Sequence, residues 1–217
     1  MSELDQLTAA ATLAQTGTAT AARAAIDALP WLRDSIEGDR AAARFDRWGR
    51  STAIDENTRT AVIPRALFEE LHERADLPAS WPVGNAGLLH CYGYLLSLES
   101  TPYGLKRDRW VRDELALACG LQPDALRPWV GDTTLLARAT SAAAAILQSP
   151  AASAVQAIDG RATRVAFSAD RGPSALAYEV APARESAPLL VTLFPVVDAS
   201  SVLGEFRAAR ILRWNAG

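Results

Sequence analysis

The feature that most constrains the fold is a change of hydrophobic period near residue 150. Before it, most segments carry apolar residues at helical spacing between recognisable caps. After it, short apolar runs alternate with turn residues, which is typical of strands. Because helices and strands are segregated along the chain, we predict an α+β fold in which a mostly helical N-terminal two-thirds packs on a C-terminal antiparallel β-meander.

The clearest helix is "DTTLLARATSAAAAILQS" (132–149), with Asp132 or Thr133 as its cap and Pro150 beyond its end. Further helices are expected at 3–15, 21–29, 64–75 and 108–120, with two short pieces split at Gly38 within 31–49 and a small hairpin within 50–64. The segment "LLHCYGYLLSL" (88–98) is apolar almost throughout, so its period does not separate a buried strand from a buried helix. Gly93 and two tyrosines favour a strand.

In the C-terminal third, Asp159-Gly160 stands between two apolar runs and is a strong signal for a tight hairpin. A further strand is expected at 174–180. The run "APLLVTLFPVV" is apolar on both faces, which predicts a central strand covered by helices. Asp198 is expected to cap a short helix, and "RILRW" (210–214) to return as the last strand.

Length and composition bound the class of protein. A chain of 217 residues with 49% hydrophobic residues can form one core. We therefore expect a single domain over 1–217, in which 1–150 is the mainly helical part with the candidate site and 151–217 is the sheet part. A net charge of −3 disfavours nucleic acid as a partner. No signal peptide and no run of about 20 apolar residues is present, so we expect a soluble cytoplasmic protein without membrane contact. A homo-oligomer is compatible with the sequence.

The well-marked chemical motifs are missing from the sequence. It has no GxSxG, SxxK, HExxH, P-loop or calcium-loop pattern, and no GxGxxG between a strand and a helix. Cys91 and Cys119, the only two cysteines, have neither zinc spacing nor the number needed for a disulfide scaffold. We expect two buried thiols, and neither a metal site nor a cofactor.

Reactive side chains are concentrated between residues 81 and 110. The segment follows the glycine-rich turn "GNAG" (84–87), whose backbone N–H groups can face an anion. Such a density of acids, bases and donors around an apolar run is expected at the floor of a pocket. The candidate catalytic residues are Lys106, His90 and Glu99, and the candidate substrate-binding residues are Arg107, Arg109, Tyr103, Tyr94 and Asn85.

Lys106 is the only lysine in the chain. A desolvated lysine has a lowered pKa and can act as a base or form a Schiff base, which an arginine cannot. The competing interpretation is an exposed loop cation in an arginine-biased sequence. His90 is a candidate acid or base or a satisfied core histidine, and His72 is expected on the surface. The segment 50–59, with two arginines around two carboxylates, is also expected to be exposed.

Two hypotheses of function follow. The first is a small cytoplasmic enzyme, of hydrolase, lyase or deaminase type, that acts on an anionic metabolite such as an amino acid or another carboxylic acid. It would use metal-independent acid/base chemistry, with Arg107 and Arg109 gripping the carboxylate. The second is a non-catalytic domain that binds a ligand or a protein through a patch rich in tyrosine and arginine.

Overall fold

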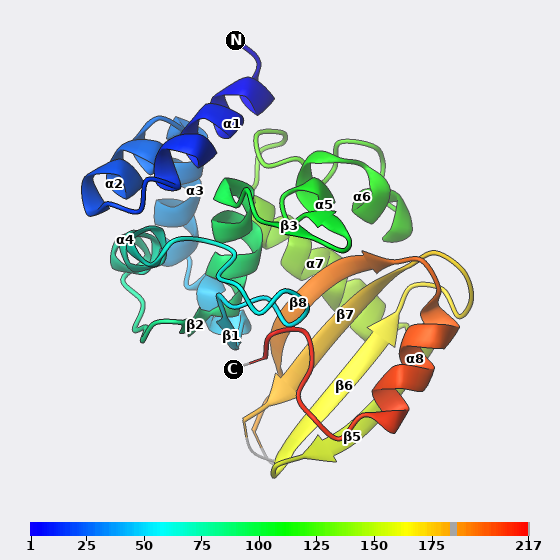
Figure 1. Ribbon diagram of the computed structural model, residues 1–217. Helices are drawn as coiled ribbons and strands as arrows, with labels where there is room; N and C mark the ends of the chain where they lie inside the picture. The colour runs from blue at the N-terminus through cyan, green and yellow to red at the C-terminus, as the bar shows by residue number, and fades with distance from the viewer. Residues whose placement is uncertain (183–185, 217) are drawn as a thin grey trace.

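The computed structural model describes residues 1–182 and 186–216, and it confirms the α+β class. Helices dominate the N-terminal part, and a four-stranded antiparallel sheet in the order β5-β6-β7-β8 forms the C-terminal part (Figure 1). The longer helices are α1 (Glu3–Ala14), α2 (Ala19–Asp27), α3 (Pro30–Ala41), α4 (Arg65–Ala75), α7 (Leu135–Gln148) and α8 (Ala199–Ala208). The sheet strands are β5 (Ala152–Ile158), β6 (Arg161–Phe167), β7 (Ser174–Ala181) and β8 (Leu189–Val196).

Shorter elements connect the helices of the N-terminal part. Two small antiparallel ladders pair β1 (Arg50–Thr52) with β2 (Val83–Asn85) and β3 (Ser100–Thr101) with β4 (Gly104–Leu105). The short helical segments are η1 (Arg44–Arg47), η2 (Leu88–Tyr92), η3 (Gly93–Leu96), α5 (Asp108–Val111) and α6 (Glu114–Ala118).

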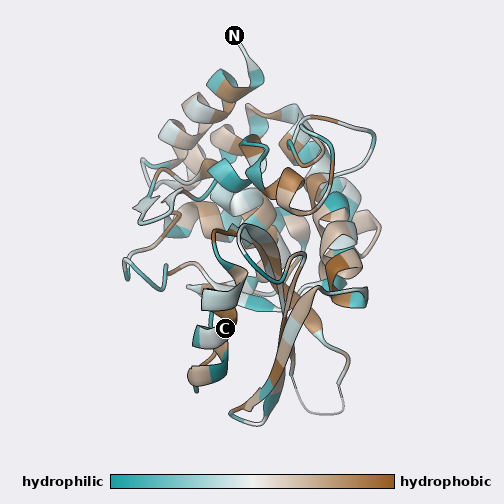
Figure 2. Ribbon diagram, turned by 90° about the vertical axis from the view of Figure 1, so that its right-hand side faces the viewer, coloured by the Kyte–Doolittle hydropathy of each residue, from teal (hydrophilic) through white to brown (hydrophobic). Residues whose placement is uncertain are grey.

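The sheet has a different helix on each face (Figure 1). Neighbouring residues of β7 point to opposite faces: Ala175 and Ala177 belong to the large core around α7, while Leu176 and Tyr178 belong to a second core under α8. Small side chains on the first face let the alanine-rich α7 approach closely. Figure 2 shows hydrophobic residues along the strands where they pass beside the helices.

Several local predictions are confirmed with small shifts of boundary. Asp159 and Gly160 both have positive φ, 49° and 77°, as the tight turn between β5 and β6 requires. Asp198 caps α8 through the N–H of Ser200. The cap of α7 is Thr134 rather than Asp132 or Thr133.

Other expectations about the helical part are wrong. Residues 88–96 are helical, as η2 and η3, rather than a strand. The segment is buried on all sides among helices, where an apolar run without a polar face fits a helix as well as a strand. Helix α3 continues through Gly38, because a single glycine costs a helix only about 1 kcal/mol. The predicted helix at 108–120 is broken at Arg112, which has extended backbone, into α5 and α6.

Three expectations about strands are also wrong. β8 is an edge strand and not a central one, and its apolar residues on both faces are used by the two cores. Residues 210–214 form no strand. Within 50–64 the strand β1 pairs with β2, from the next loop. The expected hairpin is reduced to an isolated bridge between Ile54 and Ala61 with two flanking backbone hydrogen bonds, from Asp55 to Thr60 and from Val62 to Ala53.

Among the helices of residues 1–182 and 186–216, none combines the length and apolar character needed to cross a bilayer.

Candidate functional site

A cavity of about 390 Å³, here called the site cavity, lies where the helical part meets the sheet. One wall comes from the β3–β4 hairpin and α5, and the other from the end of β8 and the first turns of α8. Residues 213–215, which follow α8, close it from a third side. The lining therefore combines residues of 1–150, where the candidate site is expected, with residues of the C-terminal part.

Five of the eight residues predicted from sequence line the site cavity: His90, Tyr94, Tyr103, Lys106 and Arg109. Tyr94 comes from η3, while Tyr103 lies at the tip of the β3–β4 hairpin, where Gly104 has a φ of +86°. Lys106 and Arg109 stand just before and within α5. That short helix is fixed by the buried Trp110, whose indole N–H donates to the carbonyl of His90 over 2.7 Å.

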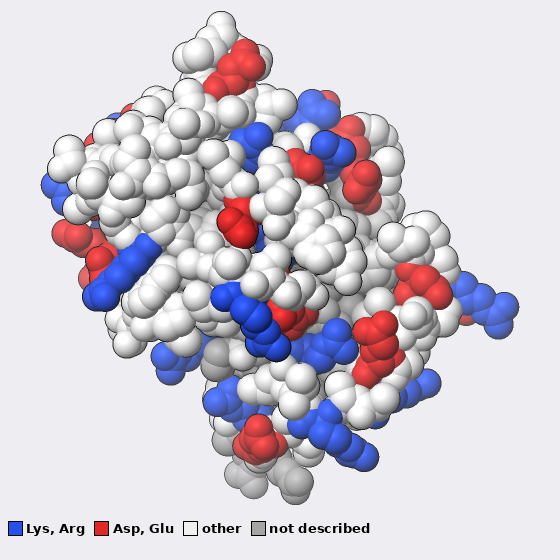
Figure 3. Space-filling view, in the orientation of Figure 1, with Lys and Arg blue, Asp and Glu red and all other residues white. Residues whose placement is uncertain are grey.

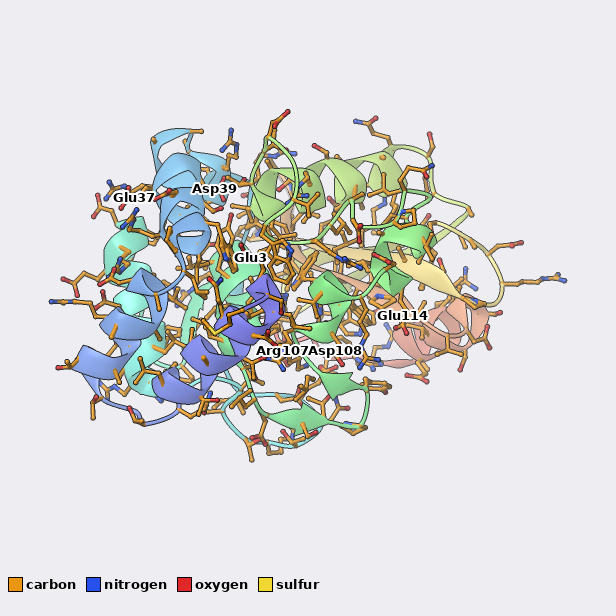
Figure 4. The ribbon with its side chains drawn as sticks, turned by 90° about the horizontal axis from the view of Figure 1, so that it is seen from above. Glu3, Glu37, Asp39, Arg107, Asp108 and Glu114 are labelled. Carbon is orange, nitrogen blue, oxygen red and sulfur yellow. The ribbon has the colours of Figure 1, made fainter. Side chains whose placement is uncertain are left out.

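The other three predicted residues lie outside the cavity lining. Arg107 does not join Arg109 in a double grip, because its guanidinium turns to α1 and donates to Thr8 over 3.2 Å (Figure 4). Arg107 and Arg109 are two positions apart at the start of α5, and helical geometry points such residues in different directions. In a strand, positions i and i+2 would share a face. Glu99 accepts a hydrogen bond from Thr60 (2.7 Å).

Asn85, the third of these residues, has a structural role. Its side-chain nitrogen donates to the carbonyls of Phe45 and Trp48, and its side-chain oxygen accepts from the N–H of Leu88. Its amide group is thus occupied by backbone partners. The substrate-binding role predicted for Asn85 does not fit this arrangement.

His90 is almost fully buried, with 2% of its surface exposed, and its protonation follows from its neighbour. Ser51 donates its single hydroxyl hydrogen to the carbonyl of Asn215 (2.8 Å), so at 2.9 Å from His90 Nε2 it can only accept. His90 therefore carries its proton on Nε2 and presents a bare Nδ1, which has no hydrogen-bond partner among the described residues. Burial lowers the pKa of His90 well below its ordinary value, and the charges of Arg109 and Lys106 lower it further.

Tyr94 is the centre around which the charged residues gather. Its ring stacks on His90 at 4.8 Å, and the Lys106 ammonium and the Arg109 guanidinium each lie 5.5 Å from the ring centre. Its hydroxyl accepts from the side-chain N–H of Asn215 (3.2 Å). Burial raises the pKa of Tyr94 to about 12, so the phenol is neutral at physiological pH.

Arg109 has no carboxylate partner among the described residues. Its polar contacts are two long hydrogen bonds, both 3.4 Å, to the Thr192 hydroxyl and the Leu193 carbonyl, and its guanidinium also lies 5.7 Å from the ring of Phe194. Burial lowers the pKa of Arg109, as expected for a cation removed from water without a compensating anion. The guanidinium thus retains capacity to bind an anion in the cavity.

Lys106, in contrast, has a carboxylate partner within the protein. Its ammonium lies 2.5 Å from Asp55 Oδ2, and the exposed fractions of the two side chains are 12% and 0%. The competing interpretation of Lys106 as an exposed loop cation is therefore wrong, and so is the expectation that the whole segment 50–59 is exposed. Burial and Arg109 lower the pKa of Lys106, while Asp55 opposes the shift.

The anion of this pair is held by its own turn. Asp55 Oδ1 accepts from the N–H groups of Asn57 (2.8 Å) and Thr58 (3.0 Å). Burial by itself raises the pKa of Asp55, but the bonds from Lys106 and Thr58 hold it below its ordinary value. Sequence reasoning missed Asp55 because nothing local marks it as the partner of a residue 51 positions away.

Sequence reasoning also missed the lining residues that come from the C-terminal third, among them Thr192, Phe194, Trp214 and Asn215. Asn215 reaches back to Ser51 and Tyr94, and its side-chain oxygen is buried without a described partner. The one local signal among them is Trp214, a large aromatic residue near the C-terminus that sequence reasoning could have placed at a pocket. The pairing of the two ends of the chain has no sequence signature.

The glycine-rich turn at 84–87 is used for packing rather than for anion binding. A side chain at Gly84 would bring its Cβ to 2.2 Å from His72 Nε2. The N–H of Asn85 donates to this same nitrogen (3.0 Å), and the N–H groups of Ala86 and Leu88 also bind protein acceptors. His72 is thus buried, with 2% exposed, and the surface position predicted for it is wrong.

The cysteines are free, with Cys91 buried and Cys119 half-buried. Burial raises the pKa of both thiols, to about 12 for Cys119, which keeps them protonated. Within residues 1–182 and 186–216, no three His, Cys, Asp or Glu side chains are grouped so that they could hold a metal ion.

Charges of both signs surround the cavity. Over the face shown in Figure 3, Lys and Arg side chains are interspersed with Asp and Glu, and no broad field of one sign covers it. A phosphate backbone over a long footprint would need such a field.

Comparisons of the chain with protein-family models, with curated proteins and with solved structures find no match.

Proposed function

We propose that the site cavity binds a small anionic metabolite whose carboxylate is held by Arg109. The observation that carries this proposal is the unpaired guanidinium: Arg109 faces the cavity without a carboxylate partner in the described chain, while the neighbouring Lys106 is matched by Asp55. A planar guanidinium binds a carboxylate through two parallel hydrogen bonds. In this proposal Arg107 and Glu99 have no role.

We further propose that the protein is an enzyme in which His90 moves the proton. Its Nδ1 carries a lone pair without a described partner and belongs to a residue that lines the same cavity as Arg109. A neutral imidazole can accept a proton from a bound substrate, and Ser51 and Tyr94 hold the ring in place. Lys106 supplies a positive charge close to the reacting groups, since its pair with Asp55 favours the ammonium form. Hydrolysis, elimination and deamination remain the reaction types proposed.

The alternative is a ligand-binding protein without catalysis. It uses the same cavity and the same anchor, and it is supported by the strongly lowered pKa of His90, which makes this imidazole a weak base. A protein-binding patch of tyrosines has less support, because Tyr94 is only 1% exposed and Tyr103 alone, at 83%, faces outward.

Binding is tested by calorimetric titration of a library of small carboxylic acids on the wild type, on Arg109→Gln and on the matched control Arg107→Gln. Charge-assisted hydrogen bonds contribute about 1.5–3 kcal/mol, so Arg109→Gln should weaken binding by roughly 10- to 150-fold. Arg107→Gln should leave it unchanged. Equal affinity of the wild type and Arg109→Gln for every acid that binds would refute the anchor.

Catalysis is tested by NMR detection of product from those acids that bind. We expect His90→Gln to retain binding and to lose turnover. If no acid that binds with dependence on Arg109 is converted by the wild type, the non-catalytic alternative holds.

A further inference from the structure

Building on the proposed anion site, we infer that its ligand is a monoanionic aromatic carboxylic acid, with the carboxylate at Arg109 and the aromatic part along one wall of the site cavity. This inference rests on the proposed function and adds the class of ligand. It is carried by three observations: an aromatic wall beside the guanidinium, a gradient from buried to exposed apolar residues, and the charge balance of the lining.

The aromatic wall consists of Tyr94, Phe194 and Trp214. The guanidinium carbon of Arg109 lies 5.5 Å from the ring centre of Tyr94 and 5.7 Å from that of Phe194, so the cation stands between two rings. Trp214 continues the wall, with its ring centre 5.9 Å from that of Phe194. A ligand whose anionic group reaches Arg109 therefore has its next atoms against aromatic faces, where a flat ring packs well.

Apolar lining continues from this wall to the mouth of the cavity. Tyr94 is 1% exposed, while Tyr103 on the β3–β4 hairpin and Val197 after β8 are 83% and 85% exposed, although both line the same cavity. Large apolar side chains held in water at the rim of a pocket are expected to contact the body of a ligand. A simple acid such as propionate would leave these surfaces and most of the 390 Å³ to water.

The charged residues that line the cavity favour a ligand with a single negative charge. Lining cations other than Arg109 already have carboxylate partners: Lys106 pairs with Asp55, and Arg213 lies 3.5 Å from Glu205. Besides Glu205, four carboxylates line the cavity: Glu56, Asp108, Glu114 and Asp198. One unmatched guanidinium among these acids accommodates a monoanion, whereas a phosphate dianion would meet repulsion that nothing in the described lining offsets.

The test compares 3-phenylpropionate with propionate, with the uncharged 3-phenylpropanol and with phenylphosphonate, each titrated into the wild type and followed by NMR chemical shifts. Burial of a phenyl ring should tighten binding of 3-phenylpropionate by about 30-fold over propionate. The alcohol and the phosphonate dianion should bind at least about tenfold more weakly than 3-phenylpropionate.

Variants separate the two parts of the site. Phe194→Leu should reduce the advantage of 3-phenylpropionate over propionate by about threefold to tenfold, and Arg109→Gln should weaken both acids. Tyr103→Ser, at an exposed hairpin tip where folding is not at risk, should reduce the advantage in the same direction. Val155→Ser is the matched control, because Val155 is 67% exposed on β5 and does not line the cavity.

Equal affinity for 3-phenylpropionate and propionate, both dependent on Arg109, would overturn this inference and leave the proposed function standing. An aromatic advantage that survives both Phe194→Leu and Tyr103→Ser unchanged would also overturn it. Binding of either acid that is unaffected by Arg109→Gln would instead overturn the proposed function, and this inference with it.

Discussion

Replacing Lys106 by methionine should destabilise the fold strongly, because it leaves a buried carboxylate without its cation. Asp55 is fully buried, and its Oδ2 atom forms an ion pair with the Lys106 ammonium at 2.5 Å. Methionine keeps most of the volume of the lysine stem and removes the charge. Asp55 Oδ1 keeps its two bonds from Asn57 and Thr58.

The magnitude follows from the separation and the burial. At 2.5 Å the gross Coulomb attraction is about 7 kcal/mol for an effective dielectric constant of roughly 20. Breaking a buried pair by removing one partner costs about 3–5 kcal/mol in measured cases. We expect the lower end, about 3 kcal/mol, because the two backbone bonds to Asp55 survive. For a chain of this size such a loss lowers the melting temperature by roughly 6–12 °C.

The assay is urea unfolding at pH 7, followed by far-UV circular dichroism, for the wild type, Lys106→Met, Asp55→Asn and the double variant. The double variant should recover much of the loss, since neither charge is then left alone. Arg65→Met is the control for an ordinary surface pair: Arg65 and Glu69 are 67% and 54% exposed, and breaking their contact should cost less than about 1 kcal/mol. If Lys106→Met costs no more than Arg65→Met, the pair has no structural role of the kind described here.

Three further outcomes are expected. Burial lowers the pKa of both histidines, so below about pH 6.5 the unfolded chain binds more protons than the folded one. The urea midpoint of unfolding should therefore fall as the pH drops from 7.5 to 5.5, and a constant midpoint would contradict this. Gly38 lies in open space on α3, so Gly38→Ala should raise the free energy of unfolding in urea by about 0.5–1 kcal/mol. Gly84→Ala should lower it by more than about 2 kcal/mol, because the added Cβ clashes with His72. Equal effects of the two variants would contradict the close packing of Gly84 on His72. Tyr92→Phe removes a hydrogen bond to the buried Asp39 and should cost about 1–3 kcal/mol by calorimetry, and an unchanged melting temperature would show that this bond contributes nothing.

Part of the candidate site could be predicted because its residues are close in sequence. His90, Tyr94, Tyr103, Lys106 and Arg109 fall within 20 positions, and their local density predicted a pocket without specifying its shape. The prediction that Arg107 and Arg109 act together assumed that they share one face, as on a strand, and it was wrong. The helical geometry of 88–96 and of α5 sends Arg107 to α1 and Arg109 to the cavity.

The sequence by itself determined the elements that depend on local chemistry. Caps such as Asp198, the Asp159-Gly160 turn and the change of period near residue 150 act over a few residues, and they fixed the α+β class and most helix boundaries. The physical reason is that capping bonds and turn dihedrals are set by neighbours along the chain.

Only the tertiary structure decided which side chains meet. Lys106 pairs with Asp55, Ser51 bridges His90 and Asn215, and His72 is buried over Gly84. Burial and ion pairing depend on segments that are far apart in sequence, and the residues next to a position do not indicate such contacts. The charge left unmatched at Arg109 is a property of the assembled fold, and so is the cavity that it faces.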